Sequence, residues 1–312
     1  TDEILKMIKE DFPEKMQGER VIFGLYIGTP TYDLPSKMKA QCDGLLNFAK
    51  VEFDTLDLTS SPKDRQDKCY EEFMNQTEEK FRKADVILVS GGNSLFAFDR
   101  WVKLDIVRFF RQALEDRKVF CGGSAGCGLF FDAIHSDSRD PTTFKNFVLK
   151  ENQFPASGES ISNKTSWKYM KVNGFGFFGG ICCPHFDNTQ TNGVLRAADF
   201  DEMLIRHKTE FGFGIDHHAV LVVTGENYKI IPSDDQAKGS VLVNENNGDT
   251  VTFAAKQGTP GCWLKKPVLV NSSKDGSKSV QIETVLLPNV GKVSDFSFKP
   301  LGDVLDDAEL QE

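Results

Sequence analysis

The sequence predicts an α/β fold with a mostly parallel sheet, helices on both faces and a β-rich C-terminal extension. Three observations predict it. Strand-like and helix-like segments alternate over the first half of the 312 residues. Glycine-rich turns follow two of the strand-like runs, at Gly91 and at Gly122. After Gly225 the pattern changes to short strand-like runs separated by turn residues, which is typical of antiparallel sheets. We expect an α/β domain over residues 1–225 and a β-rich extension over residues 226–312.

The α/β part begins with four strand-like runs separated by helical patterns. β-branched and aromatic runs predict strands, and apolar side chains three or four residues apart predict helices. Parallel strands joined in this way end at a common edge of the sheet, where ligands usually bind. Both glycine turns fall at that edge. The predicted strands cover residues 20–27, 51–58 and 84–90 and a run that begins at 119, and the predicted helices cover residues 34–50, 67–83 and 95–116.

The second half of the chain is less regular. A polar stretch with prolines and serines predicts a long flap over Asp137 to Lys168. Further strands are expected near residues 180–183 and over residues 211–223, with a weak helical pattern over residues 195–207. Five short runs then predict the strands of the extension, at residues 228–231, 241–243, 250–255, 268–270 and 280–287.

Composition excludes several classes of protein. A net charge of −9 disfavours nucleic acid and anionic membranes as partners. No apolar run is long enough to span a membrane, and the charged first 20 residues lack the apolar core of a signal peptide. Seven cysteines without a C-x-x-C spacing indicate free thiols in a reducing compartment. We therefore expect a cytoplasmic protein.

The segment Gly122-Gly-Ser-Ala-Gly126 fits a G-x-S-x-G elbow after a short apolar strand. In such an elbow the chain turns sharply from strand to helix and lifts the serine hydroxyl clear of the sheet. The backbone N–H of Ala125 would then lie beside a developing oxyanion. Ser124 is therefore a candidate nucleophile. The alternative is an ordinary glycine-rich turn.

A serine nucleophile needs a base, normally a histidine. His185 follows an apolar run in Cys-Cys-Pro184-His185-Phe-Asp187, so it falls at another strand end, and Pro184 would restrict its backbone. The alternative is a loop histidine bonded to Asp187.

The segment Gly214-Ile-Asp216-His217-His218 offers a third group that could orient His185. Successive side chains on a strand face opposite ways, so Asp216 and His217 cannot both approach His185 unless the strand breaks there. The alternative is a strand end whose polar side chains are solvated.

The turn Gly91-Gly92-Asn93 could supply a second oxyanion donor and contact the substrate, with Asn93 as a candidate binding residue. Asn93 or Ser94 could equally cap the helix that follows. A zinc site at His207, His217 and His218 is disfavoured because their spacing matches no familiar site. We expect neither a metal nor another cofactor.

These four motifs, in this order and spacing, resemble the peptidase E family of serine hydrolases, the aspartyl dipeptidases, over roughly Val21 to Val223. The family is related to cyanophycinase and has the class I glutamine-amidotransferase-like fold. The resemblance implies that Ser124 is the nucleophile of a catalytic triad, that His185 is the base, and that the N–H groups of Gly92 and Ala125 form the oxyanion hole.

The sequence departs from the family at the third catalytic group, because His217 stands where relatives usually carry a glutamate. Asp216 could serve instead if the strand is shifted, and some schemes for the family would favour Asp137 or Asp140. Relatives hold the N-terminal aspartate of the substrate with an arginine, and Arg196 is the nearest candidate.

The resemblance implies a cofactor-free hydrolase of short peptides, in particular dipeptides with an N-terminal aspartate. Because the glutamate is missing, two alternatives stay open. One is a weak or inactive relative that binds an acidic small molecule or a partner protein. The other is a cyanophycinase-like amide hydrolase. The flap and the β-rich extension could cap the cleft or form a homodimer contact.

Overall fold

The computed structural model describes residues 2–11, 21–46, 51–60, 62–150, 166–233, 236–244, 251–271 and 278–296. It divides the chain into two compact units. Unit 1 comprises Thr1–Phe130, Ser136–Ser160 and Val172–Gly176, and unit 2 comprises Phe131–His135, Ile161–Lys171 and Phe177–Glu312. The predicted domain boundary after residue 225 falls inside unit 2 and stays a prediction.

Unit 1 is built on a parallel sheet with the strand order β2-β1-β3-β4. β3 is fully buried and β1 nearly so, as expected for strands covered on both faces. The strands are β1 (Ile22–Ile27), β2 (Val51–Thr55), β3 (Val86–Val89) and β4 (Val119–Gly122), and the helices are α1 (Asp2–Asp11), α3 (Pro35–Leu46), α4 (Tyr70–Lys83), α5 (Ser94–Lys103), α6 (Val107–Glu115), α7 (Ala125–Gly128) and α8 (Lys145–Lys150), with short 3-10 turns η1 (Thr29–Thr31) and η2 (Pro141–Thr143).

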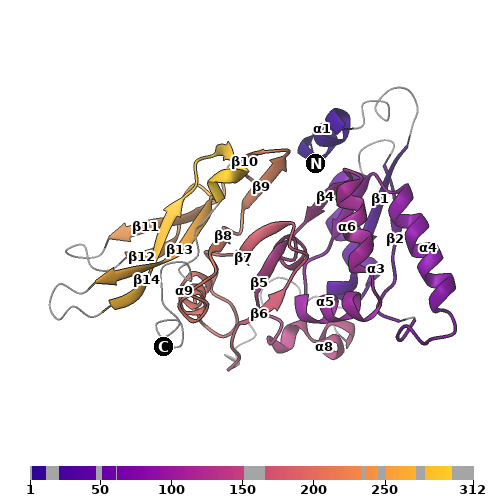
Figure 1. The fold of residues 1–312 in the computed structure, drawn as a ribbon, viewed down its shortest axis with the longest axis horizontal. Helices are drawn as coiled ribbons and strands as arrows, with labels where there is room; N and C mark the ends of the chain where they lie inside the picture. Colours follow the sequence, from indigo (N-terminus) through magenta and orange to yellow (C-terminus); the bar gives the residue numbers. More distant parts are fainter. Residues whose placement is uncertain are drawn as a thin grey trace. The chain divides into compact units, whose positions relative to one another are not determined.

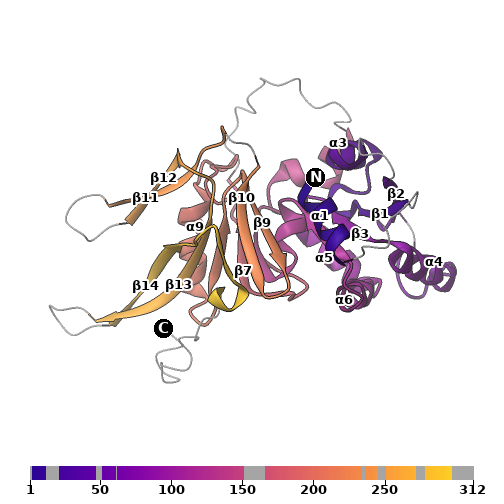
Figure 2. The ribbon, with the colours of Figure 1, turned by 90° about the horizontal axis from the view of Figure 1, so that it is seen from above.

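Helices cover both faces of this sheet, as the sequence predicted (Figure 1). α1 packs against Ile22, Val86 and Val119 on one face, and α3 packs nearby on Tyr26 and Leu88 of the same face. On the opposite face α4 and α6 meet through aromatic contacts, and Phe110 of α6 lies over the strand residue Phe120. Figure 2 shows α3 on one side of the strands and α4 with α6 on the other. The predicted α/β architecture is confirmed.

The single helix predicted over residues 95–116 is wrong. The structure has two helices, α5 and α6, separated at Asp105, whose φ is 61°. A left-handed residue ends one helix and redirects the chain before the next. The apolar spacing continues across the break because both helices bury side chains in the same core, which includes Trp101 and Phe110.

Unit 2 contains most of a mixed six-stranded sheet with the order β14-β13-β8-β7-β5-β6. β5, β7 and β8 are parallel, whereas β13 pairs antiparallel with both β8 and β14. Smaller antiparallel sheets join β9, β10 and β15, and β11 with β12. The elements are β5 (Phe131–Ser136), β6 (Met170–Asn173), β7 (Phe178–Pro184), α9 (Arg196–Arg206), β8 (Gly212–Ile215), β9 (Ala219–Thr224), β10 (Asn227–Pro232), β11 (Gly239–Asn244), β12 (Val251–Gly258), β13 (Cys262–Asn271), β14 (Lys278–Leu286), β15 (Val290–Lys292) and η3 (Val293–Phe296).

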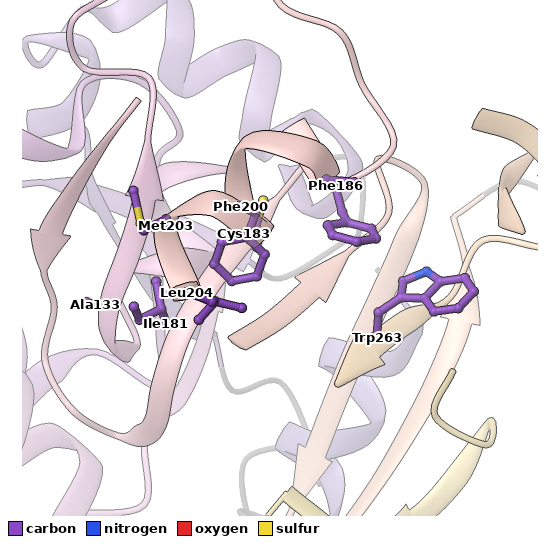
Figure 3. Close-up of a cluster of buried hydrophobic side chains, with 9 residues drawn as sticks. Ala133, Ile181, Cys183, Phe186, Phe200, Met203, Leu204 and Trp263 are labelled. Atoms are coloured by element: carbon purple, nitrogen blue, oxygen red, sulfur yellow. The ribbon is translucent and has the colours of Figure 1, made fainter. Parts of the chain in front are cut away.

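The core of unit 2 lies between α9 and this sheet (Figure 3). Phe200, Met203 and Leu204 of α9 pack on Ile181 of β7 and its neighbours. Phe186, just beyond β7, packs in the same cluster as Trp263 of β13. The extension therefore shares a core with the segment that carries His185.

The strand predicted over residues 211–223 is also wrong as one element. β8 ends at Ile215, a turn carries Asp216, His217 and His218, and β9 begins a different sheet at Ala219. A buried carboxylate cannot stay inside an apolar strand without donors, and Asp216 finds its donors outside the strand. The predicted extension strands are confirmed as β10 to β14.

Of the predicted flap over Asp137 to Lys168, η2 and α8 form its first part, and residues 151–165 lie outside the described residues. All seven cysteines lie in the described residues, and none of them forms a disulfide. No helix among the described residues has the length and apolarity that a membrane span requires.

Candidate active site

Ser124 lies at a sharp turn between β4, which ends at Gly122, and α7, which begins at Ala125. Its φ of 54° and ψ of −116° place a non-glycine residue in a strained region of backbone space. Such strain is expected of the serine in a G-x-S-x-G elbow. The side chain makes no capping hydrogen bond to α7, so the hydroxyl is not used to cap the start of the helix.

The glycines around Ser124 are required by close backbone approach. A Cβ on Gly122 would lie 2.6 Å from the backbone carbon of Gly126, and a Cβ on Gly126 would lie 2.1 Å from the carbonyl oxygen of Val89. Both distances are shorter than a carbon atom tolerates. The elbow is therefore packed directly on β3, and its glycines cannot be replaced without moving the serine.

The Gly91-Gly92-Asn93 loop lies beside the elbow in the same unit. A Cβ on Gly91 would be 3.2 Å from the Cβ of Ser124. Gly92 has a φ of 121° and packs against Pro30, whose carbonyl accepts from the N–H of Asn93 at 2.8 Å. The loop therefore lies close to Ser124, and an oxyanion hole formed by the N–H groups of Gly92 and Ala125 stays a prediction.

The side chain of Asn93 is bonded within unit 1. Its oxygen accepts from the N–H of Phe96 at 2.9 Å and caps α5, and its amide donates to the hydroxyl of Thr143 at 3.1 Å. The capping alternative is therefore present, and a substrate-binding role for Asn93 stays a prediction.

His185 follows β7 directly and has a φ of 51°, another non-glycine residue in the left-handed region. Hydrogen bonds fix the segment that follows it. The N–H of Phe186 donates to the carbonyl of Ile215 at 3.0 Å, and the N–H of Asn188 donates to the carbonyl of His185 at 2.9 Å. These bonds hold the imidazole at the end of β8, next to the turn that follows it.

His217, in that turn, contacts His185. Their Nδ1 atoms lie 2.6 Å apart, and the amide nitrogen of Asn188 lies 3.1 Å from the same Nδ1 of His217. The carboxylate of Asp187 accepts from the backbone N–H of His217 at 2.7 Å and holds the turn in place. Burial, followed by the positive charge of Arg196, lowers the pKa of His185 to about 3. His185 is therefore neutral at pH 7, the form in which a general base acts.

Asp216 points away from the two histidines into the extension. Its carboxylate accepts from the N–H of Gly261 at 3.0 Å, from the indole N–H of Trp263 at 3.4 Å, and from both the backbone N–H, at 3.1 Å, and the hydroxyl of Ser240. The side chain is 2% exposed, and burial raises its pKa. Asp216 therefore anchors β11 and β13 to the turn that carries His217.

The other predicted residues have partners of their own. Asp140 accepts from the N–H and hydroxyl of Thr142 and caps η2. Arg196 is 1% exposed and donates to the carbonyl of His135 at 2.5 Å, with its guanidinium over the ring of Tyr169. Asp137 and Asp140 belong to unit 1, and Arg196 belongs to unit 2.

Sequence reasoning missed two features of unit 2. The first is the contact of Asn188 with His217. Asn188 stands three residues after His185, a spacing typical of a turn, and that spacing was the only sign in the sequence that Asn188 lies near His185. A buried row also joins Cys183, His135 and Asp199, with the imidazole 3.6 Å from the thiol and 2.9 Å from the carboxylate. Cys183 and His135 are fully buried, and burial raises the pKa of the thiol to about 12, so this row is structural.

The described ranges contain no group of three or more His, Cys, Asp or Glu side chains arranged to hold a metal ion. Ser124 belongs to unit 1 and His185 to unit 2, so the pairing of nucleophile and base joins two units and stays a prediction.

Comparison with known families decides the wider assignment. Residues 30–231 match the model of Peptidase family S51. The chain belongs to peptidase family S51. Membership implies a serine peptidase, and the matched region of this S51 chain contains the elbow, the His185 segment and the Asp216-to-His218 turn, while most of the β-rich extension lies beyond it.

The chain is also similar to individual proteins. A putative peptidase E protein from Listeria monocytogenes EGD-e has 15% identity and a TM-score of 0.47, with 73% of this chain and 94% of that chain covered. A peptidase from an acI-B1 Actinobacterium has 15% identity and a TM-score of 0.48, with 82% and 88% covered. A curated Trypanosoma brucei brucei protein named G2/mitotic-specific cyclin-1 is 26% identical over 229 residues, which is 72% of this chain. The matched region spans 60% of that protein's length.

Proposed function

We propose that this S51 chain is a cofactor-free serine peptidase that cleaves short peptides through an acyl-enzyme at Ser124. The observation that carries the proposal is the strained backbone of Ser124 in a glycine-flanked elbow. Strain of this kind costs on the order of 1–3 kcal/mol and persists where the surroundings enforce it, commonly at active sites. Membership of the family supports the same role.

In the proposed reaction the hydroxyl oxygen of Ser124 attacks the peptide carbonyl carbon, and Nε2 of His185 takes the hydroxyl proton. The N–H groups of Gly92 and Ala125 stabilise the resulting oxyanion. When the carbon–nitrogen bond breaks, His185 gives its proton to the leaving amine. Water then attacks the acyl-enzyme, with His185 again as the base. His217 accepts a hydrogen bond from His185 throughout, in the place of a carboxylate.

A fluorophosphonate probe tests the nucleophile. We expect covalent labelling of the wild-type protein on the peptide that contains Ser124, and no labelling of Ser124→Ala. Ser94→Ala is a matched control because Ser94 is a buried serine bonded to Ser136 and Ser138. A folded wild-type protein that resists the probe would remove the proposal.

For the substrate we propose dipeptides with an N-terminal aspartate, on the strength of the resemblance. Arg196, the expected clamp, is almost fully buried and bonded to His135, so the geometry around it gives the preference no added support. A panel of Asp-X, Asn-X and Leu-X dipeptides decides the matter by the ratios of kcat/KM. Equal values for Asp-X and Leu-X would exclude an aspartyl preference.

A second candidate is a weak or inactive relative that binds an acidic small molecule or a partner protein. The contact between His185 and His217 favours it, because a neutral imidazole stabilises an imidazolium less than a carboxylate does. The same probe separates the two candidates. We propose a cytoplasmic location for either one.

A further inference from the structure

Asn188 contacts His217 at Nδ1, the ring nitrogen that faces His185. Its amide nitrogen lies 3.1 Å from Nδ1 of His217, and that Nδ1 lies 2.6 Å from Nδ1 of His185. All three residues belong to unit 2. Asn188 is therefore placed to influence which ring carries the hydrogen between them.

The chemistry of the groups determines the location of that hydrogen. An amide NH2 group only donates hydrogen bonds, and a neutral ring nitrogen accepts only when it carries no hydrogen. With the amide nitrogen of Asn188 as the donor in the 3.1 Å contact, Nδ1 of His217 is the acceptor and His217 carries its hydrogen on Nε2. The hydrogen between the rings belongs to Nδ1 of His185, and Nε2 of His185 keeps a free lone pair.

We propose that Asn188 is a positioning residue that fixes the tautomers of His185 and His217. Two neutral imidazoles can share one hydrogen in either direction, and the reverse direction would place the hydrogen of His185 on Nε2. That form cannot take a proton from Ser124. The amide of Asn188 favours the active direction because it donates to His217. The consequence for catalysis rests on the function proposed above, whereas the tautomers themselves do not depend on it.

The backbone of Asn188 is held at both ends. Its N–H donates to the carbonyl of His185 at 2.9 Å, and its carbonyl accepts from the N–H of Arg196 at 3.0 Å. The side chain therefore starts from a fixed position relative to His185. The neighbouring residue Asp187 holds His217 in place, because its carboxylate accepts from the backbone N–H of His217. The 185–188 segment thus aligns both rings.

The test is nitrogen NMR of the imidazole rings in protein labelled with 15N-histidine, at a pH where His185 is neutral. The chain has five histidines, so the signals of His185 and His217 can be assigned by single His→Gln variants. In the wild type we expect His185 with its hydrogen on Nδ1 and His217 with its hydrogen on Nε2. The opposite pair of tautomers would overturn the inference.

Asn188→Asp replaces the donor by an acceptor of the same shape. A carboxylate draws the hydrogen onto Nδ1 of His217, so His185 should change to the form with its hydrogen on Nε2. We expect kcat to fall by at least about tenfold, because an imidazole in the wrong tautomer is a poor base, while KM changes little. Asn188→Ala should give a mixture of tautomers and a smaller loss of kcat. It replaces Asn188→Asp as the test if Asn188→Asp does not fold.

Asn192→Asp is the matched control. It introduces the same charge four residues along, where the side chain contacts Trp167 and Val194 instead of the histidines. We expect wild-type tautomers and kcat. Unchanged tautomers in Asn188→Asp and Asn188→Ala, or a higher kcat in Asn188→Asp, would overturn the inference. Failure of Ser124 to react with the probe would overturn the proposed function and leave the tautomer result to decide the role of Asn188.

Discussion

The Nδ1 atoms of His185 and His217 lie 2.6 Å apart, although the two residues follow different strands, β7 and β8, in unit 2. The distance is that of a short hydrogen bond. In the proposed mechanism His217 therefore takes the place of the carboxylate that usually orients a catalytic imidazole. Its neighbour Asp216, a competing candidate from the sequence, is bonded to the β-rich extension instead.

His217→Ala should lower kcat without unfolding the protein. Loss of the ring leaves His185 free to rotate and to change tautomer, so we expect a fall of roughly ten- to a hundredfold, smaller than the loss of a triad aspartate. Steady-state kinetics with the best dipeptide measure it. His218→Ala is the control, because the His218 ring also touches His217 but its Nδ1 bonds Ser233 and not His185. Equal losses in both variants would contradict the assignment.

The pH dependence of kcat/KM should show an acid limb far below pH 6.5. Burial lowers the pKa of His185 to about 3, and the neutral form, present above that pKa, is the active one. We therefore expect kcat/KM to stay nearly constant between pH 8 and about pH 5. Fluorophosphonate labelling rates over the same range give an independent profile. A limb centred near pH 6.5 would show that His185 is exposed to water in the free enzyme.

Asp216→Asn should destabilise unit 2 more than it alters chemistry. The amide keeps one accepting oxygen and adds two donors that face other donors, so several buried bonds are lost. We expect a loss of about 3 kcal/mol in the free energy of unfolding. Urea unfolding followed by Trp fluorescence measures it. A variant of wild-type stability with a reduced kcat would show that Asp216 takes part in catalysis.

His135 should make stability depend on pH. Burial lowers its pKa to about 4, while an unfolded histidine titrates near 6.5. Between these values the unfolded state binds more protons, so stability falls as the pH drops, by up to about 1.4 kcal/mol per pH unit.

His135→Gln should remove this dependence. The amide keeps a hydrogen-bonding group without a proton that titrates, so the difference in unfolding free energy between pH 6.5 and pH 5 should shrink by about 2 kcal/mol. His218→Gln, on an exposed turn, is the control. An unchanged difference would mean that His135 is accessible to protons in the folded state.

The sequence predicted the α/β order and the elbow because both depend on local patterns. Alternating periodicity marks strands and helices, and glycines two residues to either side of Ser124 mark a turn that excludes side chains. Both signals lie within a few neighbouring residues, so no knowledge of the rest of the chain was needed.

The role of Asp216 could not be predicted in this way. Its donors come from Ser240, Gly261 and Trp263, which lie 24 to 47 residues further along the chain. No local pattern indicates such partners. The break between α5 and α6 at Asp105 could not be predicted for a related reason. The apolar spacing continues through it, and the left-handed residue is an aspartate rather than a glycine.

The backbone geometry of Ser124 has a practical consequence for trapping complexes. Its side chain does not cap α7, so Ser124→Gly removes an unfavourable left-handed conformation without deleting a stabilising bond. That variant should melt at a higher temperature than the wild type while leaving bound peptide intact. It is therefore the form of choice for crystallising the protein with an uncleaved ligand.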